Sequence, residues 1–301
     1  MTNQGESADN LPLRGAGTSG TDTRPLGAGP VLVVAIGGLD PSGGAGVVRD
    51  LLTARTFGAR VRVVPTAWTE QAPGTGVASV EPRAPARLED AVASAWRAGA
   101  RDGLPVAVKV GMLPDAQAAA AILAALGGAG SFAGPFVLDP VLGASSGGAL
   151  FRDAPAALLP LAARATLVTP NVPEVAALLG LSASDIRTLD DVARAGRALL
   201  DAGARAVLVK GGHLPGGGPG NAGGGTFDAV DTLVTPAGVR SFAASRHPGP
   251  DVRGTGCALA TAIAVGLGRG LSLEVAIGDA KDWLRGALEG AVRRGGEWHI
   301  D

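Results

Sequence analysis

From residue 30 onward, short apolar runs alternate with longer segments in which Ala and Leu recur at helical spacing. Apolar runs without polar alternation are typical of strands that are buried on both faces of a sheet. They predict strands at residues 31–36, 61–66, 106–110, 136–139, 166–169 and 206–210. The segments between them predict helices at residues 45–56, 88–98, 115–126, 175–179 and 189–202.

This alternation of strands and helices predicts an α/β fold, with a mostly parallel sheet covered by helices on both faces. Near the end of the chain the pattern changes. Residues 228–234 and 239–243 flank a Thr-Pro-Ala-Gly turn and predict an antiparallel hairpin. Residues 258–268 and 273–288 predict two closing helices. In an open α/β sheet, ligands bind beyond the carboxyl ends of the strands, so candidate chemistry is sought there.

Composition narrows the class of protein. The 301 residues are 46% hydrophobic and 18% charged, with a net charge of −1, which gives no electrostatic footprint for nucleic acid or an anionic membrane. No apolar run is long enough to span a bilayer. The single cysteine excludes an intrachain disulfide framework and suits a reducing cytosol, so we expect a cytoplasmic protein.

Two kinds of segment depart from the α/β rhythm. Residues 1–29 are rich in Gly, Ser, Thr and Asn and lack the apolar middle of a signal peptide, so we expect a disordered tail before one domain at 30–301. Residues 212–225 are nearly all Gly, Pro, Asn and Ala, which predicts a flexible surface loop. Residues 246–251 form a candidate flap.

Gly254, Thr255, Gly256 and Cys257 lead directly into the apolar helix predicted from residue 258. Glycines let a backbone approach a ligand closely, and the free amides of a helix's first turn favour anions such as phosphate. At that position a thiolate on Cys257 would also be stabilised. The alternative for this segment alone is a plain helix cap with a small buried thiol.

Carboxylates and a cation follow the later strands. Asp139 stands where a central strand ends and is either a turn cap or a ligand of hydrated Mg²⁺. Asn171 and Glu174 follow the next strand, either as an ordinary helix start or as groups that order water and Mg²⁺ around phosphates. Lys210 ends an apolar strand, either as a surface lysine or as a phosphate ligand.

Asp40 lies in the glycine-rich turn after the first strand, which matches neither the dinucleotide fingerprint nor the P-loop. The turn is either a tight strand-to-helix connection or a set of small residues against a flat ligand, with Asp40 facing it. Together, an anion cradle, a lysine and carboxylates are what phosphoryl transfer requires.

Six motifs in fixed order resemble the hydroxymethylpyrimidine/phosphomethylpyrimidine kinases of the ribokinase-like superfamily. The resemblance covers residues 31–288 and rests on Asp40-Pro-Ser-Gly-Gly-Ala-Gly46, Val108-Lys-Val-Gly-Met-Leu113, Val137-Leu-Asp-Pro-Val141, Thr169-Pro-Asn-Val-Pro-Glu174, Val209-Lys-Gly-Gly-His-Leu214 and Gly254-Thr-Gly-Cys257. It implies a three-layer αβα sandwich and a homodimer. It also implies a kinase of thiamine biosynthesis that uses ATP and Mg²⁺ to phosphorylate 4-amino-5-hydroxymethyl-2-methylpyrimidine and then its monophosphate.

The resemblance also implies roles for individual residues. Cys257 would be the general base at the reacting hydroxyl, which requires a lowered thiol pKa, and Gly254 and Gly256 would stabilise the transferring phosphoryl group. The pyrimidine would be bound by Gln71, Gly38, Asp40, Met112 and Val141. ATP would be bound by Lys210, Asn171 and Thr255. Asp139 and Glu174 would organise Mg²⁺.

Several positions depart from the family pattern. Members usually have a small hydroxylic residue at Leu39, an aliphatic one at Trp68, and Lys then Asp where this chain has Ser145 and Gly148. Arg253 replaces the usual His and is a candidate for the missing cation. Residues 70–72 read Glu-Gln-Ala rather than Ala-Gln-Asn. These departures bear on the ring pocket, which Trp68 is expected to reshape, and on handling of the second phosphate.

Three other functions are compatible with the sequence. A pyridoxal-type vitamin kinase on the same fold differs only in its ring substrate. A non-catalytic pyrimidine sensor would bind without turnover, and an inactive paralogue would catalyse nothing. Turnover with the two ring substrates distinguishes a pyridoxal-type kinase from the pyrimidine kinase. Substitution of Cys257 tests whether the protein is a catalyst that uses this thiol.

Overall fold

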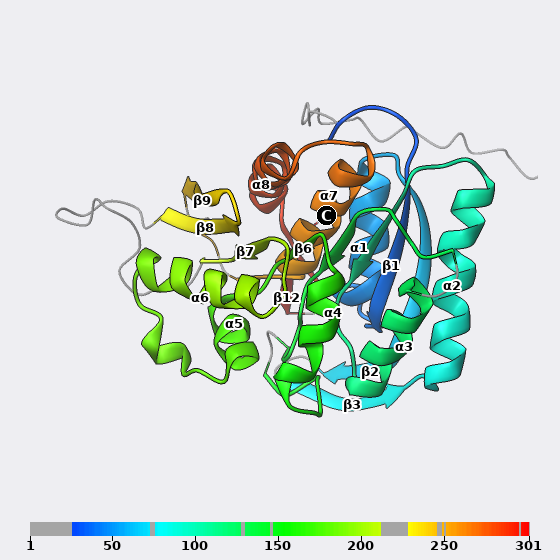
Figure 1. Ribbon diagram of the computed structural model, residues 1–301, viewed down its shortest axis with the longest axis horizontal. Coiled ribbons are helices and arrows are strands. Elements are labelled where there is room, and N and C mark those ends of the chain that lie inside the picture. Colours follow the sequence, from blue (N-terminus) through cyan, green and yellow to red (C-terminus); the bar gives the residue numbers. More distant parts are fainter. Residues whose placement is uncertain are drawn as a thin grey trace, which may run out of the picture.

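The apolar runs of the sequence form one central sheet (Figure 1). The computed structural model describes residues 26–72, 76–127, 130–144, 147–211, 228–245, 249, 251–294 and 296–300. In this part of the chain the strand order is β3-β2-β1-β4-β5-β6-β7-β8-β9. The strands are β1 (Leu32–Leu39), β2 (Arg60–Ala72), β3 (Gly76–Pro82), β4 (Val106–Val110), β5 (Phe136–Leu138), β6 (Leu167–Val168), β7 (Val207–Val209), β8 (Asp228–Thr235) and β9 (Gly238–Ser245).

Neighbouring strands from β2 through β7 pair in parallel, while β3, β8 and β9 pair antiparallel at the two ends of the sheet. The predicted mostly parallel sheet and the late hairpin, which is β8–β9, are therefore confirmed. Because parallel strands send their carboxyl ends to one edge, the segments after β1, β4, β5, β6 and β7 gather there.

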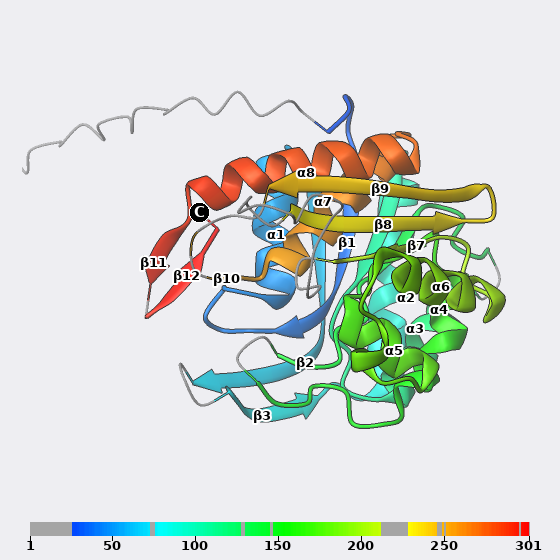
Figure 2. The same ribbon diagram turned by 90° about the vertical axis from the view of Figure 1, so that its left-hand side faces the viewer.

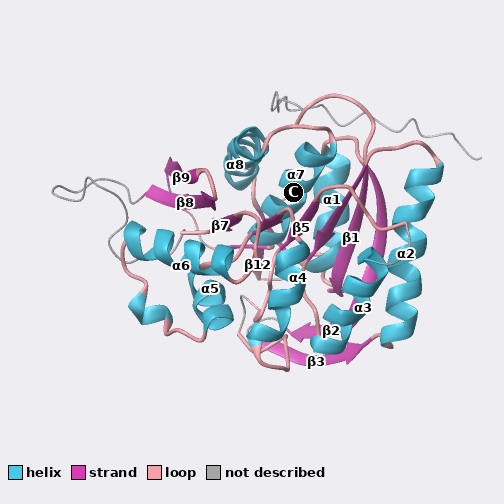
Figure 3. Ribbon diagram, viewed as in Figure 1, coloured by secondary structure: helices cyan, strands magenta, loops and turns pink. Residues whose placement is uncertain are grey.

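Helices cover both faces of the sheet and complete the αβα sandwich that was expected (Figures 1 and 3). One face carries α1 (Gly46–Thr56), α7 (Thr255–Gly268) and α8 (Leu273–Glu289). The other carries α2 (Pro85–Arg101), α3 (Ala116–Gly127), α4 (Leu159–Arg164), α5 (Val172–Leu179) and α6 (Leu189–Asp201), with short 3₁₀ turns η1 (Pro155–Leu158) and η2 (Ala183–Asp185). None of the helices described is both long and apolar enough to cross a membrane.

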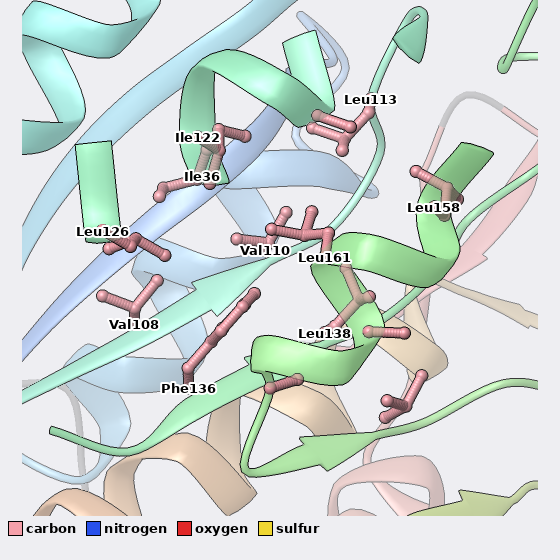
Figure 4. Packing of buried hydrophobic residues seen from close by; sticks show 14 of the residues in the cluster. Ile36, Val108, Val110, Leu113, Ile122, Leu126, Phe136, Leu138, Leu158 and Leu161 are labelled. Atoms are coloured by element: carbon pink, nitrogen blue, oxygen red, sulfur yellow. The ribbon is translucent and has the colours of Figure 1, made fainter. Parts of the chain in front are cut away.

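Alternate residues of the buried strands feed two separate cores. Val108, Val110 and Phe136 point toward α3 and α4, where they pack with Ile122 and Leu161 (Figure 4). The intervening residues of the same strands pack against α7 and α8 on the opposite face. This period of two is the reason why unbroken apolar runs predicted the strands correctly.

A second, three-stranded sheet was not predicted. It has the order β10-β12-β11 and consists of β10 (Val252–Arg253), β11 (Val292–Arg294) and β12 (Glu297–His299) (Figure 2). β10 immediately precedes α7, and β12 pairs with β10 in parallel. The last part of the chain is thereby brought to the start of α7.

Residues 26–29, which we assigned to the tail, are part of the folded body. Leu26 is fully buried, and Arg269 donates hydrogen bonds to the carbonyls of Leu26, Gly29 and Phe57 at 3.0, 2.9 and 2.6 Å. Residues 1–25, the predicted loop at 212–225 and most of the candidate flap at 246–251 lie outside the described residues.

Candidate active site

A cation and two carboxylates from three strand ends meet at the carboxyl edge of the sheet. Lys210, after β7, donates from Nζ to Asp139 Oδ1, after β5, at 2.7 Å, and lies 4.0 Å from Glu174 Oε2 on α5. Thr169, after β6, donates from Oγ1 to the same Asp139 oxygen at 3.1 Å. Because the side chain of Lys210 is only 17% exposed, the surface-lysine interpretation is wrong.

These charged groups shift one another's pKa values. Burial opposes the charge of Lys210, but Asp139 and Glu174 raise the pKa of its ammonium group above the ordinary value. Burial likewise opposes ionisation of Asp139, yet Lys210 and Lys109 hold the pKa of this carboxyl below its usual range. For Glu174, burial prevails over the attraction of Lys210 and raises the pKa to about 7. Lys210 and Asp139 are therefore a charged pair at neutral pH.

Asn171 and Glu174 form a capping box at the start of α5. Asn171 Oδ1 accepts from the Glu174 amide at 2.8 Å, and Glu174 Oε2 accepts from the Asn171 amide at 2.7 Å. The ordinary helix-start interpretation is thus confirmed. It does not compete with the functional one, because the cap fixes the Glu174 carboxylate beside Lys210.

The start of α7 lies against this cluster. A Cβ on Gly256 would stand 3.3 Å from Lys210 Nζ and 3.9 Å from Asp139 Oδ2. Gly254 has a φ of 78°, and a Cβ there would come within 2.2 Å of the Gly44 carbonyl oxygen. No side chain caps the helix. Gly254 is therefore required by its φ and by close backbone contact, Gly256 lets α7 approach the charged cluster, and the first-turn amides stay available for an anion.

Cys257 lies in the first turn of α7 and is partly exposed. Burial raises the pKa of its thiol to about 11, because the opposing effect of Lys109 is weaker, and Asp50 and Asp139 add to the rise. The sequence-based expectation of a stabilised thiolate is wrong for the protein without ligands, in which Cys257 is a neutral thiol at pH 7. Desolvation and the nearby carboxylates outweigh the effects of Lys109 and of a backbone hydrogen bond from Gly46 on this pKa.

One oxygen of the cluster has no hydrogen-bond partner among the described residues. Asp139 Oδ2 is buried and accepts no hydrogen bond from this part of the chain, an arrangement that usually indicates a ligand or an ion. Carboxylate oxygens suit Mg²⁺, which keeps several waters and binds through one or two carboxylates plus substrate phosphates. No group of three or more His, Cys, Asp or Glu residues suited to a metal occurs in the described part of the chain. Asp139 and Glu174 fit a magnesium ion shared with a nucleotide.

A small apolar group also lies at the carboxyl edge of the sheet. Met112, which follows β4, packs with Ala67 and Leu150, and Val141 borders the same group. A Cβ on Gly38 would come within 2.9 Å of the Met112 sulfur, so a larger residue there would have to displace the Met112 side chain. The structure thus brings Gly38, Met112 and Val141 together. Gln71 belongs to β2, but its side chain lies outside the described residues.

Asp40 is held in a network rather than pointing freely into the pocket. Its carboxylate accepts from the Ser42 amide and hydroxyl at 3.0 and 2.9 Å, and Arg253 Nη2 lies 3.0 Å from Oδ2. Arg253 also bonds Glu297 Oε2 on β12 at 2.8 Å. Sequence reasoning missed Glu297, and no motif or periodicity marks it.

Two of the departures from the family pattern can be placed. Trp68 is 51% exposed, whereas its neighbours Ala67 and Thr69 are both 2% exposed. Trp68 is therefore not buried in the apolar group formed by Ala67, Met112 and Leu150, and the expectation that it reshapes the ring pocket stays a prediction. The Gly148 carbonyl accepts from the Ala144 amide at 3.1 Å. Ser145 lies outside the described residues.

Comparison with known proteins agrees with this geometry. The family described as phosphomethylpyrimidine kinase matches residues 40–300. The chain belongs to this family. The hydroxymethylpyrimidine/phosphomethylpyrimidine kinase of Streptomyces coelicolor is 36% identical over 276 residues, covering 89% of this chain and 92% of the relative. That of Rhizobium meliloti is 40% identical over 265 residues, covering 87% and 92%.

Solved structures agree in fold. The phosphomethylpyrimidine kinase of Clostridium difficile gives a TM-score of 0.67 at 31% identity and covers 86% of this chain and 99% of its own. Pyridoxal kinase of Staphylococcus aureus, in complex with AMP-PCP and pyridoxal, gives 0.72 at 25% identity and covers 90% and 92%. The chain is therefore a ribokinase-like member of a kinase family.

Proposed function

We propose that this protein transfers the γ-phosphoryl group of ATP to 4-amino-5-hydroxymethyl-2-methylpyrimidine, and then phosphorylates the monophosphate, in thiamine diphosphate biosynthesis. The observation that carries the proposal is the contact of Lys210 and Asp139 with the glycine-rich start of α7, in a chain of the phosphomethylpyrimidine kinase family. Phosphoryl transfer depends on positioning and on stabilising charge, and this cluster supplies both.

Lys210 and the amides after Gly254 bind the phosphates of ATP in this proposal. Lys210 stays protonated, and the uncapped first turn of α7 presents N–H groups at the positive end of the helix dipole. Thr255 begins the helix, and Asn171 holds the Glu174 backbone in place. Asp139 and Glu174 would hold Mg²⁺, which when bound would neutralise phosphate charge.

Cys257 lies at the reacting hydroxyl in this scheme and can receive its proton only in the thiolate form. A thiol with a pKa of about 11 is a thiolate in only a small fraction of molecules at pH 7. Phosphoryl transfer passes through a loose transition state, in which electrostatic stabilisation matters more than early deprotonation of the attacking oxygen. We therefore assign most of the rate enhancement to Lys210 and the α7 amides. The hydroxyl proton passes to the minor thiolate form of Cys257, which becomes the thiol.

The pyrimidine lies on the wall formed by Gly38, Met112 and Val141, with the Gln71 amide on its polar edge. An amide can both donate and accept hydrogen bonds, which suits the edge of an aminopyrimidine. Asp40 acts through its ion pair with Arg253, which holds the loop after β1 against α7.

Product analysis tests this function. Purified protein with ATP and Mg²⁺ is expected to convert the hydroxymethylpyrimidine to its monophosphate and then to its diphosphate, which anion-exchange chromatography separates. Accumulation of the monophosphate alone would limit the proposal to the first step. The fold likeness to a pyridoxal kinase makes pyridoxal the competing substrate. A much higher kcat/KM for pyridoxal would overturn the pyrimidine assignment.

A further inference from the structure

Lys109 is a fully buried lysine in β4 for which the mechanism above has no use. In the register of the sheet it is paired with Val137 of β5, two residues before Asp139. Side chains two residues apart share a face of a strand, so Lys109 and Asp139 project from the same face of the sheet. That face is the one covered by α1 and α7.

The ammonium group of Lys109 binds Asp50 on α1, and Asp50 in turn binds Thr261 on α7. Its Nζ lies 2.9 and 3.0 Å from the two carboxylate oxygens of Asp50 on α1. Thr261 on α7 donates from Oγ1 to Asp50 Oδ1 at 2.9 Å. The side chains of Lys109 and Asp50 are both completely buried, so water does not screen the pair.

The cationic end of this pair lies near the carboxyl end of β4. A Cβ on Gly111 would stand 2.7 Å from Lys109 Nζ, which places the ammonium beside the backbone that leads to Met112 at the carboxyl edge of the sheet. Thr261 is four residues after Cys257, so it lies about 6 Å, or roughly one helical turn, further along α7 than Cys257.

Charge coupling agrees with this placement. Burial opposes the charge of Lys109, but Asp50, Cys257 and Asp139 raise the pKa of its ammonium group above the ordinary value, so it stays protonated. A buried charge acts over several ångströms because the surrounding medium is only weakly polarisable.

We propose that Lys109 is a positioning residue for phosphoryl transfer, a fixed buried cation that ties α1 to α7 through Asp50 and Thr261 and adds positive potential beneath the anion cradle. The inference rests on the proposed kinase function. It gives the Lys109–Asp50 ion pair a role in catalysis that does not require direct contact with ATP or the pyrimidine.

Two charge-altering variants separate this role from a purely structural one. Lys109→Met with Asp50→Leu removes both charges while keeping apolar volume, a replacement that folded proteins usually tolerate. Asp50→Asn keeps the cation and an oxygen that can accept from Lys109 and Thr261. A merely structural pair would respond to both changes in the same direction.

The first readout is the dissociation constant of ATP with Mg²⁺, measured by calorimetry on the full chain at fixed salt. For Lys109→Met/Asp50→Leu we expect ATP affinity and kcat each to fall about tenfold, as expected for a charge several ångströms away. For Asp50→Asn we expect ATP affinity to be unchanged or higher. Equal losses in both variants, or unchanged affinity and kcat in the double variant, would overturn the proposal.

A control addresses lost stability. Leu88→Ala, in the core on the opposite face of the sheet, destabilises the fold without touching the site. It is expected to lower the melting temperature while leaving ATP affinity and kcat unchanged, and a loss of ATP affinity equal to that of the double variant would overturn the proposal.

If the wild type binds ATP but turns over neither pyrimidine nor pyridoxal, the kinase assignment fails while the affinity comparison still tests Lys109. A wild type that does not bind ATP contradicts both.

Discussion

The thiol of Cys257 lies between opposing influences. The ammonium of Lys109 and a backbone hydrogen bond from Gly46 favour a thiolate, while burial and the carboxylates of Asp50 and Asp139 favour the thiol and raise its pKa. The carboxylates and the burial prevail, so this residue is poorly suited to act as a strong base before substrates arrive. Its contribution to catalysis is therefore a matter for measurement.

Replacing Cys257 with Ala is expected to lower kcat by about 10²-fold, the lower end for loss of a general base, with little change in the KM for the pyrimidine. Steady-state kinetics at saturating ATP measures both constants. An unchanged kcat would remove Cys257 from the proton-transfer step. Pyrimidine binding without turnover by the wild type would instead favour the sensor.

Alkylation reports the thiol directly. Because the pKa of Cys257 is raised from its ordinary value near 9 to about 11, the rate of iodoacetamide modification in the protein without ligands should rise with pH to a midpoint near 11. The same shift makes the unfolded chain lose this proton first, so its contribution to stability declines as pH rises from 9 to 11. A midpoint at 8–9 would contradict the structure.

Much of the site could be predicted from single residues in the sequence. Asp139, Lys210 and Glu174 stand at strand ends or helix starts, where the topology necessarily brings them together. The pKa of Cys257 could not be predicted, because it depends on burial and on carboxylates from α1 and β5 that are distant in sequence. The Lys109–Asp50 pair was missed for a similar reason, since a lone lysine in an apolar strand does not identify its partner.

At the scale of elements, the small sheet of β10, β11 and β12 holds the loop after β1 in place. Arg253 on β10 bonds both Asp40 in that loop and Glu297 on β12. A Cβ on Gly44 would come within 2.8 Å of His299 Nδ1, so the end of β12 also touches the loop. The sheet therefore forms one wall of the candidate active site.

Glu297→Gln tests this wall. Loss of a partly buried ion pair to Arg253 is expected to loosen the loop and raise the KM for the pyrimidine about fivefold, corresponding to roughly 1 kcal/mol. We expect kcat to change less than twofold. Glu289→Gln, at the exposed end of α8, is the matched control and should change neither constant. A fall in kcat at unchanged KM would assign Glu297 a different role.

Elements differ in how well the sequence predicts them. The central strands could be predicted from long apolar runs, because a strand that is buried on both faces has apolar residues at successive positions. The strands β10, β11 and β12 are too short to show any period, and β3 begins with Gly76 and ends with Pro82, which suggest a turn. α4 is a single short helix beside two prolines, and its sequence gave no helical pattern.

For the whole molecule we expect a homodimer, on the basis of family resemblance. Light scattering should give twice the 29.5 kDa of one chain at micromolar concentration. The exposed Trp68 of β2 is the candidate contact, and Trp68→Ala is expected to shift the equilibrium toward monomer. A monomeric wild type at working concentration would contradict the expectation.

The ion pair between Asp40 and Arg253 joins residues 213 positions apart, and β12 completes the same network from still later in the chain. Contacts of such long sequence separation form late in folding. During synthesis, the loop after β1 leaves the ribosome long before β10 and β12 exist, because chains emerge from the N-terminus first. A nascent chain therefore contains the loop after β1 before the small sheet of β10, β11 and β12 that holds it in place. It gains full affinity for its substrates only when β12 has been synthesised.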